Sequence, residues 1–398
     1  MLLEPQISSD GASQDASSKI SSSSALIKER IRRTLAKGLY YSRTLAAVRR
    51  LAQNYHVEAH YSSKVPHLRR DSSSKFAILC YHRVGTEGIP FFSRLDPSVF
   101  EAQMRYLKKH YRVVSLGQLC KELRDSTPVE PTLAITFDDG YRDLYSYALP
   151  VLRKYQIPAT VYLIGRCMET GEAPWYDRIF AALQTALGSF LDLQLAAPRH
   201  FTFTSKESRV AAAWEIVRYL RTIPDAERRE WCANFERRLT VPQPQIANRI
   251  LNWEQVQEMR REGVDFGAHT MTHPAVGRLN SQAFDEELLQ SKRLLENGLN
   301  APVEDFAYPF GKLSDCSPAA EEFLSRCAYR SAVTTVEGYN VSGANRFQLF
   351  RLQVNDDPSL PSFALAVGRL FLEAPPEWLA TQRVSTDLST ASSQRETI

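Results

Sequence analysis

The chain has 398 residues, of which 43% are hydrophobic and 24% are charged. This composition excludes a fibrous protein and a chain that is disordered over its whole length. The 49 basic residues nearly balance the 45 acidic ones and leave a net charge of +4, so charge gives no support for nucleic acid as a partner.

The N-terminal region divides into two segments of different composition. Residues 1–24 are rich in serine and predict a disordered leader. Residues 25–54 repeat apolar side chains at helical spacing with many basic residues between them, so residues 25–75 predict a basic amphipathic helical region and a linker. Such a helix would bind an anionic membrane surface or a partner's groove, or would pack on the main domain with its basic face in water. The packing explanation is the one we favour.

The sequence carries few signals of its cellular compartment. It has no apolar run of about 18 residues that could span a membrane, and its first residues lack the pattern of a secretory signal. The six cysteines form no Cys-x-x-Cys pair, which argues against a zinc finger and favours free thiols in a reducing compartment. We therefore expect a cytoplasmic protein, with peripheral contact at the inner membrane face through residues 25–54 as an open alternative.

Strand-like and helical segments alternate over most of the remaining chain. Residues 76–165 and 253–372 follow this rhythm, whereas residues 166–252 are mostly helical and too long for an ordinary connection. The alternation predicts an α/β fold, a distorted (β/α) barrel of seven or eight parallel strands with an inserted helical subdomain and an N-terminal basic helix. Residues 373–398 are polar and predict a C-terminal tail. The expected strands are residues 76–81, 111–115, 132–137, 159–164, 264–268, 305–308, 331–335 and 349–354.

Two clusters of polar residues follow expected strands. Asp138 and Asp139 come directly after residues 132–137, and adjacent carboxylates are unfavourable unless a cation or a proton lies with them. The alternative is an ordinary Asp-Gly turn with both acids in water. His269 and His273 follow residues 264–268 at a spacing that lets both imidazoles reach one metal ion, the alternative being two unrelated loop histidines.

Both clusters are expected at the carboxyl ends of strands, where barrels of this type carry their active sites. One carboxylate and two imidazoles are a common ligand set for catalytic zinc, with one position left open for water. The second carboxylate would then act as a general base toward that water. The two clusters together therefore indicate a hydrolytic metal centre.

These motifs resemble those of the polysaccharide deacetylases, the NodB-like carbohydrate esterases of family 4. Thr-Phe-Asp-Asp-Gly-Tyr at 136–141 is similar to their first motif and His-Thr-Met-Thr-His at 269–273 to their second. Tyr-Pro-Phe at 308–310 resembles part of the third. Leu-Cys-Tyr-His-Arg-Val at 79–84 and Trp-Glu-Gln-Val at 253–256 are typical of one branch of the family.

The resemblance implies a reaction and the residues that carry it. Asp139, His269 and His273 would bind a divalent metal ion, expected to be zinc, and Asp138 would be the general base. The reaction would be hydrolysis of an N-acetyl group on an amino sugar in a polysaccharide, an oligosaccharide or a glycolipid precursor, with release of acetate. The partner would be an acetylated glycan or a precursor of one.

The resemblance also implies contacts with the substrate. A backbone N–H near Tyr141 would stabilise the oxyanion of the tetrahedral intermediate. One wall of the sugar groove would be formed by Tyr308, Pro309 and Phe310.

The chain departs from the family pattern at two places. Ala307 stands where many members carry an arginine that orients the base, and no histidine follows His273 to act as general acid. We hypothesise that His82, after the first strand, protonates the leaving amine. The alternative is that it only hydrogen-bonds the backbone there. Arg351, on the last expected strand, could supply the missing arginine in the substrate site, the alternative being a structural ion pair.

Other interpretations stay open at this point. Trp-Tyr-Asp at 175–177 could cover the site as an aromatic lid, or could belong to the core of the insertion. The barrel could bind a carbohydrate without catalysis, or could hydrolyse a non-sugar amide or imide. Retention of Asp138 argues against binding alone, because binding would not need a second carboxylate.

Overall fold

The computed structural model describes residues 75–86, 94–125, 130–185, 188–239, 249–354 and 359–372. The predicted leader, the basic helical region before residue 75 and the tail at 373–398 lie outside these ranges. Within the described part of the chain, no helix combines the length and the apolar character needed to cross a membrane.

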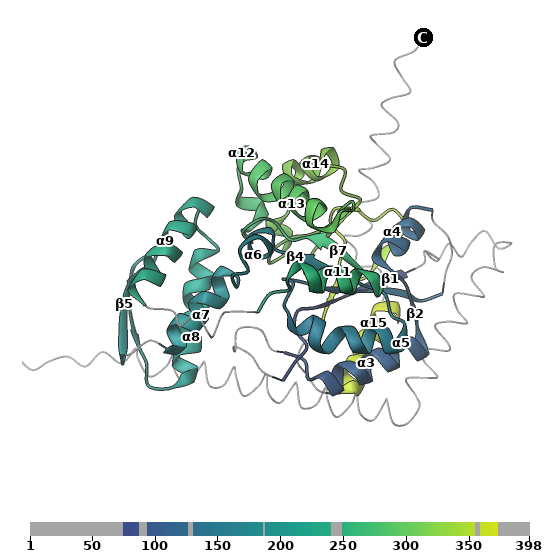
Figure 1. Ribbon diagram of the computed structural model, residues 1–398, viewed down its shortest axis with the longest axis horizontal. Helices are drawn as coiled ribbons and strands as arrows, with labels where there is room; N and C mark the ends of the chain where they lie inside the picture. The colour runs from purple at the N-terminus through teal and green to yellow at the C-terminus, as the bar shows by residue number, and fades with distance from the viewer. Residues whose placement is uncertain are drawn as a thin grey trace, which may run out of the picture.

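The centre of the molecule is a nine-stranded sheet that curls into an incomplete barrel (Figure 1). Six strands lie side by side in parallel, and their order in the sheet is the same as their order along the chain. The α/β distorted barrel predicted from the sequence is confirmed. In spatial order these strands are β1 (Lys75–Tyr81), β3 (Thr132–Phe137), β4 (Ala159–Leu163), β7 (Val264–Ala268), β8 (Asp305–Ala307) and β9 (Ser331–Val333).

The segment that precedes β11 (Leu352–Gln353) brings the two edges of the sheet together. Leu349 forms a parallel bridge with Val333 of β9, and β11 then pairs in parallel with β1. Two further strands are marginal: β2 (Arg112–Val113) pairs with the start of β3, and β10 (Asn340–Val341) is the antiparallel neighbour of β1. The chain thus crosses from the last parallel strand back to the first.

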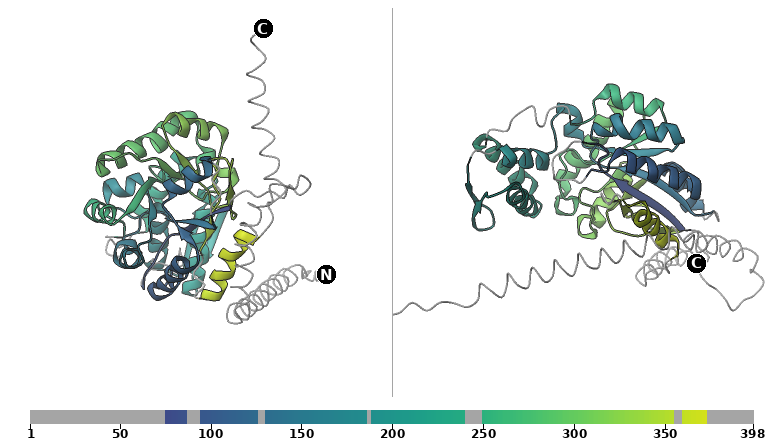
Figure 2. Two further views of the ribbon diagram at one scale, coloured as in Figure 1. Left: turned by 90° about the vertical axis from the view of Figure 1, so that its right-hand side faces the viewer. Right: turned by 90° about the horizontal axis from the view of Figure 1, so that it is seen from below.

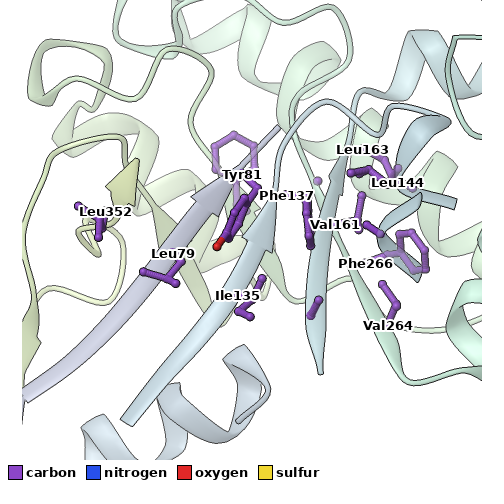
Figure 3. Packing of buried hydrophobic residues seen from close by; sticks show 14 of the residues in the cluster. Leu79, Tyr81, Ile135, Phe137, Leu144, Val161, Leu163, Val264, Phe266 and Leu352 are labelled. Atoms are coloured by element: carbon purple, nitrogen blue, oxygen red, sulfur yellow. The ribbon is translucent and has the colours of Figure 1, made fainter. Parts of the chain in front are cut away.

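The strands are buried on both faces, which explains why the sequence shows continuous apolar runs instead of alternation. Leu79, Ile135 and Val161 lie on neighbouring strands and belong to one large cluster (Figure 3). Ile78 and Tyr162 belong to a second cluster, on the other face. These two layers hold the strand ends rigidly in place.

Helices surround the sheet (Figure 2). The first begins where Asp96 accepts a 2.8 Å hydrogen bond from the Ser98 N–H and Pro97 occupies the first turn, as is usual at helix starts. The segment 281–299 is helical and contains a π-helical turn, η3 (Asp285–Leu289). The helices are α3 (Pro97–His110), α4 (Leu116–Asp125), α5 (Leu149–Tyr155) after the π-turn η1 (Leu144–Ala148), α11 (Trp253–Arg261), α12 (Ser281–Phe284), α13 (Gln290–Leu299), α14 (Pro318–Arg326) and α15 (Leu360–Leu372).

The segment between β4 and α11, here called the insertion, stands at one side of the barrel (Figures 1 and 2). It has its own hydrophobic cluster, in which Tyr176 and Phe180 pack with Ile216 and Phe235. The sequence predicted a mostly helical segment here, and the structure adds a β-hairpin, whose weak apolar alternation gave little signal. The elements are α6 (Gly165–Thr170), α7 (Trp175–Thr185), β5 (Phe190–Gln194), β6 (Pro198–Thr202), α8 (Lys206–Leu220) and α9 (Asp225–Arg238).

The start of α7 is buried where the insertion meets the barrel. Trp175, Tyr176 and Asp177 are all almost inaccessible to solvent. Burial raises the pKa of Asp177 to about 7, although the positive charges of Arg83 and Arg249 oppose the shift. A carboxyl group with these properties makes the stability of this junction depend on pH.

We predict that Gly267→Ala destabilises the fold. A Cβ at Gly267 of β7 would lie 2.5 Å from the Tyr162 ring and 2.7 Å from the Asp305 carbonyl oxygen. The free energy of unfolding in urea should fall by about 1–3 kcal/mol. Gly85→Ala is the control, because its Cβ would make only ordinary contacts at 3.5 Å. Equal unfolding midpoints for the two variants would contradict this account of the core.

A second prediction concerns Asp177→Asn. The pKa of Asp177 is about 7 in the fold against an ordinary value of 3.8, so protonation of Asp177 stabilises the fold in full below about pH 4, and this contribution is lost as the pH rises through 7. Asparagine cannot titrate. The stability of the variant relative to the wild type should therefore rise between pH 4 and 8, by up to about 4 kcal/mol in chemical unfolding. Parallel pH profiles would mean that Asp177 titrates normally.

Candidate active site

The carboxyl ends of four strands of the same sheet carry the residues that the sequence singled out. His82 follows β1, Asp138 and Asp139 follow β3, His269 follows β7, and Tyr308 follows β8. Because these strands are parallel and adjacent or nearly so, their carboxyl ends lie at the same rim of the barrel. The fold therefore collects side chains from 82 to 308 in one place.

Asp139, His269 and His273 converge at this rim. The Nε2 atoms of both imidazoles lie 3.5 Å from Oδ1 of Asp139, and all three side chains are buried. One ligand atom from each residue lies within 4.8 Å of the others. The three residues predicted as metal ligands are thus brought together by the fold.

The spacing of these three residues fits a metal ion better than direct contact. A distance of 3.5 Å is long for a hydrogen bond, but two ligands about 2.0–2.2 Å from a tetrahedral ion are separated by roughly 3.4 Å. Oδ2 of Asp139 is buried and has no hydrogen-bond partner among the described residues. Nδ1 of His269 lies 2.7 Å from the Ala307 carbonyl oxygen, which makes it the N–H donor and leaves the Nε2 lone pair for a ligand bond.

The protonation of Asp139 and of His273 also suits a cation, whereas for His269 burial lowers the pKa but Asp139 and Asp138 outweigh it and raise the pKa. Burial raises the pKa of Asp139, but the neighbouring His269 and His273 outweigh this effect and bring the pKa below its ordinary value. For His273, burial and the neighbouring His269 hold the pKa well below its usual range. A neutral imidazole beside a carboxylate is the state in which both groups can bind a divalent ion.

The loop from 269 to 273, here called the His loop, is compact and not helical. Thr270 and His273 adopt left-handed φ angles of 63° and 61°. The Thr270 hydroxyl accepts a 2.9 Å hydrogen bond from the His273 N–H, and this closes the loop. Glu287 of η3 accepts hydrogen bonds from the backbone N–H groups of Met271 and Thr272. The spacing of the two histidines thus produces convergence through a turn held by side chains.

Asp138 faces a different partner from Asp139. Arg351 is fully buried and donates two 2.7 Å hydrogen bonds, one to each oxygen of the Asp138 carboxylate. Burial raises the pKa of Asp138, but the charge and hydrogen bonds of Arg351 outweigh it and hold the pKa well below its ordinary value. The second acid of the pair is therefore ionised at neutral pH and held in one orientation by Arg351.

Arg351 is not placed for direct contact with a substrate. Its guanidinium also donates to the Thr334 carbonyl oxygen and to the Thr136 hydroxyl, at 2.6 Å and 3.1 Å. Since its side chain has 0% exposure, it offers no surface to a ligand. The structure thus places Arg351 in a buried ion pair that orients the Asp138 carboxylate.

His82 lies on the open side of the site. Its Nε2 atom is 3.9 Å from Oδ2 of Asp138, and 22% of its side chain is exposed. Cys80, two residues before it, donates its S–H to the same oxygen at 3.5 Å. Among the side chains around Asp138, the imidazole of His82 is thus the one that a substrate can approach.

The residues expected at the sugar groove are more buried than a groove wall requires. Tyr308 and Pro309 are buried, and Phe310 is partly exposed with its ring centre 4.8 Å from that of His273. Tyr141 is buried and forms an antiparallel bridge with Ile250. Phe310 is therefore the member of this group whose side chain is available to a ligand.

Sequence reasoning missed the residues that hold the His loop from outside. Glu287 lies in a run of three acids at 285–287, and Arg228 lies among the charged residues at 227–230. In such runs every side chain looks like part of a solvated helix face. No local signal distinguishes the buried member.

Known proteins of one family are similar to this chain in sequence and in fold. A family model described as polysaccharide deacetylase matches residues 125–326, about half of the chain. YxkH of Bacillus subtilis (strain 168), a protein named for the same family, is 22% identical over 298 residues, which cover 74% of this chain and 77% of that protein. The Streptococcus pyogenes deacetylase PplD, solved in complex with acetate, has a TM-score of 0.51 at 21% identity and covers 74% of this chain and 99% of its own. At this identity the structural likeness concerns the fold.

Shorter matches are found with proteins of more specific name. Poly-beta-1,6-N-acetyl-D-glucosamine N-deacetylase of Escherichia coli (strain K12) is 30% identical over 98 residues, which are 24% of this chain and 15% of that protein. The enzyme of the same name from Staphylococcus epidermidis is 31% identical over 124 residues, 42% of its length. The family match over half of the chain, on a barrel that carries the expected rim residues, shows that this protein belongs to the polysaccharide deacetylase family of hydrolases.

Proposed function

We propose that this protein is a zinc-dependent deacetylase that hydrolyses an N-acetyl group on an amino sugar within a glycan or a glycan precursor. The observation that carries the proposal is the arrangement of Asp139, His269 and His273 at metal-ligand spacing, with the ionised Asp138 next to them. The names of the poly-N-acetylglucosamine deacetylases that match part of the chain support an N-acetylglucosamine unit as substrate.

The donor set accounts for the metal and its chemistry. Two imidazole nitrogens and one carboxylate oxygen are ligands that zinc prefers, and three protein ligands leave a position for water or substrate. Held by these residues, a zinc ion would lower the pKa of bound water and polarise the acetamide carbonyl. His269 would be kept in the required tautomer by the Ala307 carbonyl oxygen.

Asp138 is proposed as the general base. Its carboxylate would accept the proton of the attacking water, and Arg351 would hold both carboxylate oxygens in a fixed plane. A divalent ion on Asp139 also compensates the repulsion between the adjacent acids. A protein that only binds carbohydrate would have no use for a second acid with its own buried arginine.

His82 and the groove residues are proposed to complete the reaction. His82, which is partly exposed beside Asp138, would donate a proton to the leaving nitrogen when the C–N bond breaks. A backbone N–H near Tyr141 would stabilise the oxyanion. The exposed part of Phe310 would contact the sugar, and the buried residues Tyr308 and Pro309 directly before it would help to hold it in place.

The decisive test measures metal and acetate together. The purified protein should contain close to one zinc per chain and should release acetate from oligomers of N-acetylglucosamine, and a chelator should abolish this release. Asp139→Ala should lose zinc, whereas Asp138→Asn should keep zinc and lose about 10²–10⁴-fold in kcat. Zinc without acetate release from any N-acetylated sugar, but with hydrolysis of a cyclic imide, would favour a non-sugar amidohydrolase. Absence of both zinc and acetate release would favour a barrel that binds carbohydrate without catalysis.

The role of His82 is tested by His82→Ala. If this imidazole is the general acid, kcat should fall by about 10²–10⁴-fold while zinc content stays at the wild-type level. A substrate with a better leaving group, such as an aryl acetate, should be affected much less, because its departure needs no protonation. Wild-type turnover of the N-acetyl substrate by the zinc-loaded variant would remove His82 from the mechanism.

A further inference from the structure

The His loop is held by contacts from outside the barrel as well as from within it. The indole N–H of Trp175, at the start of α7, lies 3.4 Å from the carbonyl oxygen of His273. The ring of Tyr176 meets the imidazole of His273 edge-on, with the ring centres 4.9 Å apart. Both residues belong to the hydrophobic cluster of the insertion. The second histidine of the metal cluster is therefore in contact with the insertion on its backbone and on its ring.

Arg228 on α9 makes a second connection to the same loop. One of its terminal nitrogens donates to the Thr272 hydroxyl at 3.0 Å and to the Thr272 carbonyl oxygen at 3.3 Å. Asp225 pairs with the same guanidinium, which also lies over the ring of Trp175 at 4.8 Å. The side chain is only 4% exposed, so these contacts are shielded from water.

Thr272 is thereby held by one residue of the barrel and by one residue of the insertion. Glu287 of the barrel accepts from its backbone N–H at 2.8 Å and from its hydroxyl at 2.7 Å. Arg228 of the insertion donates to the carbonyl oxygen and the hydroxyl of the same residue. Each hydrogen-bonding group of the residue that precedes His273 thus has a buried charged partner.

The backbone of the loop explains why such support is needed. Thr270 and His273 have left-handed φ angles, which are unfavourable for residues with a Cβ. Without external contacts, a short loop would relax toward ordinary angles and would turn the His273 ring away from Asp139. The contacts at Thr272 and at the His273 carbonyl oppose this relaxation.

We propose that Arg228 and Trp175 are positioning residues through which the insertion sets the geometry of His273 in the metal site. The inference rests on the proposed function, because it assigns these residues to the zinc ligands. The segment that interrupts the barrel pattern is then a required part of the metal centre. Loss of either contact weakens zinc binding without removing a ligand.

The cavity beside these residues does not provide a different explanation. It has a volume of about 250 Å³ and includes His273, Thr272 and Trp175 in its wall, together with several arginines. These arginines are paired: Arg178 with Glu172 and Glu236, and Arg229 with Asp225. Since acids match the positive charge, the wall is no anion site, and Arg228 is explained by the loop that it holds.

The test compares zinc affinity among variants of the full-length protein. Arg228→Ala should weaken zinc binding about 10–100-fold in a competition titration with a chromophoric chelator. Trp175→Phe keeps the ring, removes the N–H donor, and should give a smaller loss in the same direction. Arg228→Lys, with one donor group in place of a fork, should fall between Arg228→Ala and the wild type. At saturating zinc, kcat should recover and KM should stay near the wild-type value.

Arg229→Ala is the matched control. Arg229 is the next residue of α9 and pairs with the same Asp225, at 3.0 Å, but it is 50% exposed, and its ion pairs with Asp225 and Glu286 lie outside the His loop. It should bind zinc like the wild type.

Wild-type zinc affinity in a folded Arg228→Ala and in Trp175→Phe would overturn the inference while the proposed function stands. A raised KM with unchanged zinc affinity would also overturn it, because that result assigns Arg228 to the substrate. Should Arg228→Ala not fold, the Lys and Phe variants still decide. Absence of zinc binding by the wild type itself would instead refute the proposed function.

Discussion

A fully buried ion pair between Arg351 and Asp138 joins the closure of the barrel to its reactive rim. Arg351 directly precedes β11, which pairs with β1. Its guanidinium also donates to Thr334 next to β9 and to Thr136 in β3. Removing one partner of such a pair leaves a buried charge uncompensated, at a cost of about 3–5 kcal/mol. The same interaction therefore fixes where the ends of the sheet meet and how the proposed base is oriented.

The rim depends on backbone conformations that are rare for residues with side chains. Asp139, Thr270, His273 and Phe310 all have φ between 61° and 73°. Each lies just after a strand, where the chain turns sharply enough to direct a side chain back over the barrel. Rigid strands that are buried on both faces provide the support against which this strain is held. The site therefore lies at the strand ends, where rigid strand backbone is followed by a sharp turn.

The insertion and the barrel meet at the same place. Trp175, Tyr176 and Asp177 were open to interpretation as a lid or as core, and the structure makes them buried contacts between the two parts. Arg221 of the insertion likewise lies over the Phe310 ring at 3.8 Å. A segment with its own hydrophobic cluster thus reaches both the His loop and the third motif. Its contacts link the stability of the insertion to the geometry of the reactive rim.

The sequence by itself determined the main parallel strands and the residues at their carboxyl ends. Apolar runs such as 132–137 and 264–268 are local signals, and the acids and imidazoles that follow them need only parallel strands to meet at one rim.

Only the tertiary structure decided which charged residues serve the site. Arg351 meets Asp138 across 213 residues of chain, and Arg228 meets Thr272 across 44. Neither spacing follows from periodicity. Arg228 lies among charged residues that resemble it, and Arg351 stands in a short apolar run, where nothing in the local pattern names its partner. Local sequence patterns predict burial and turns, but a pairing between distant charges depends on how the barrel closes and where the insertion packs.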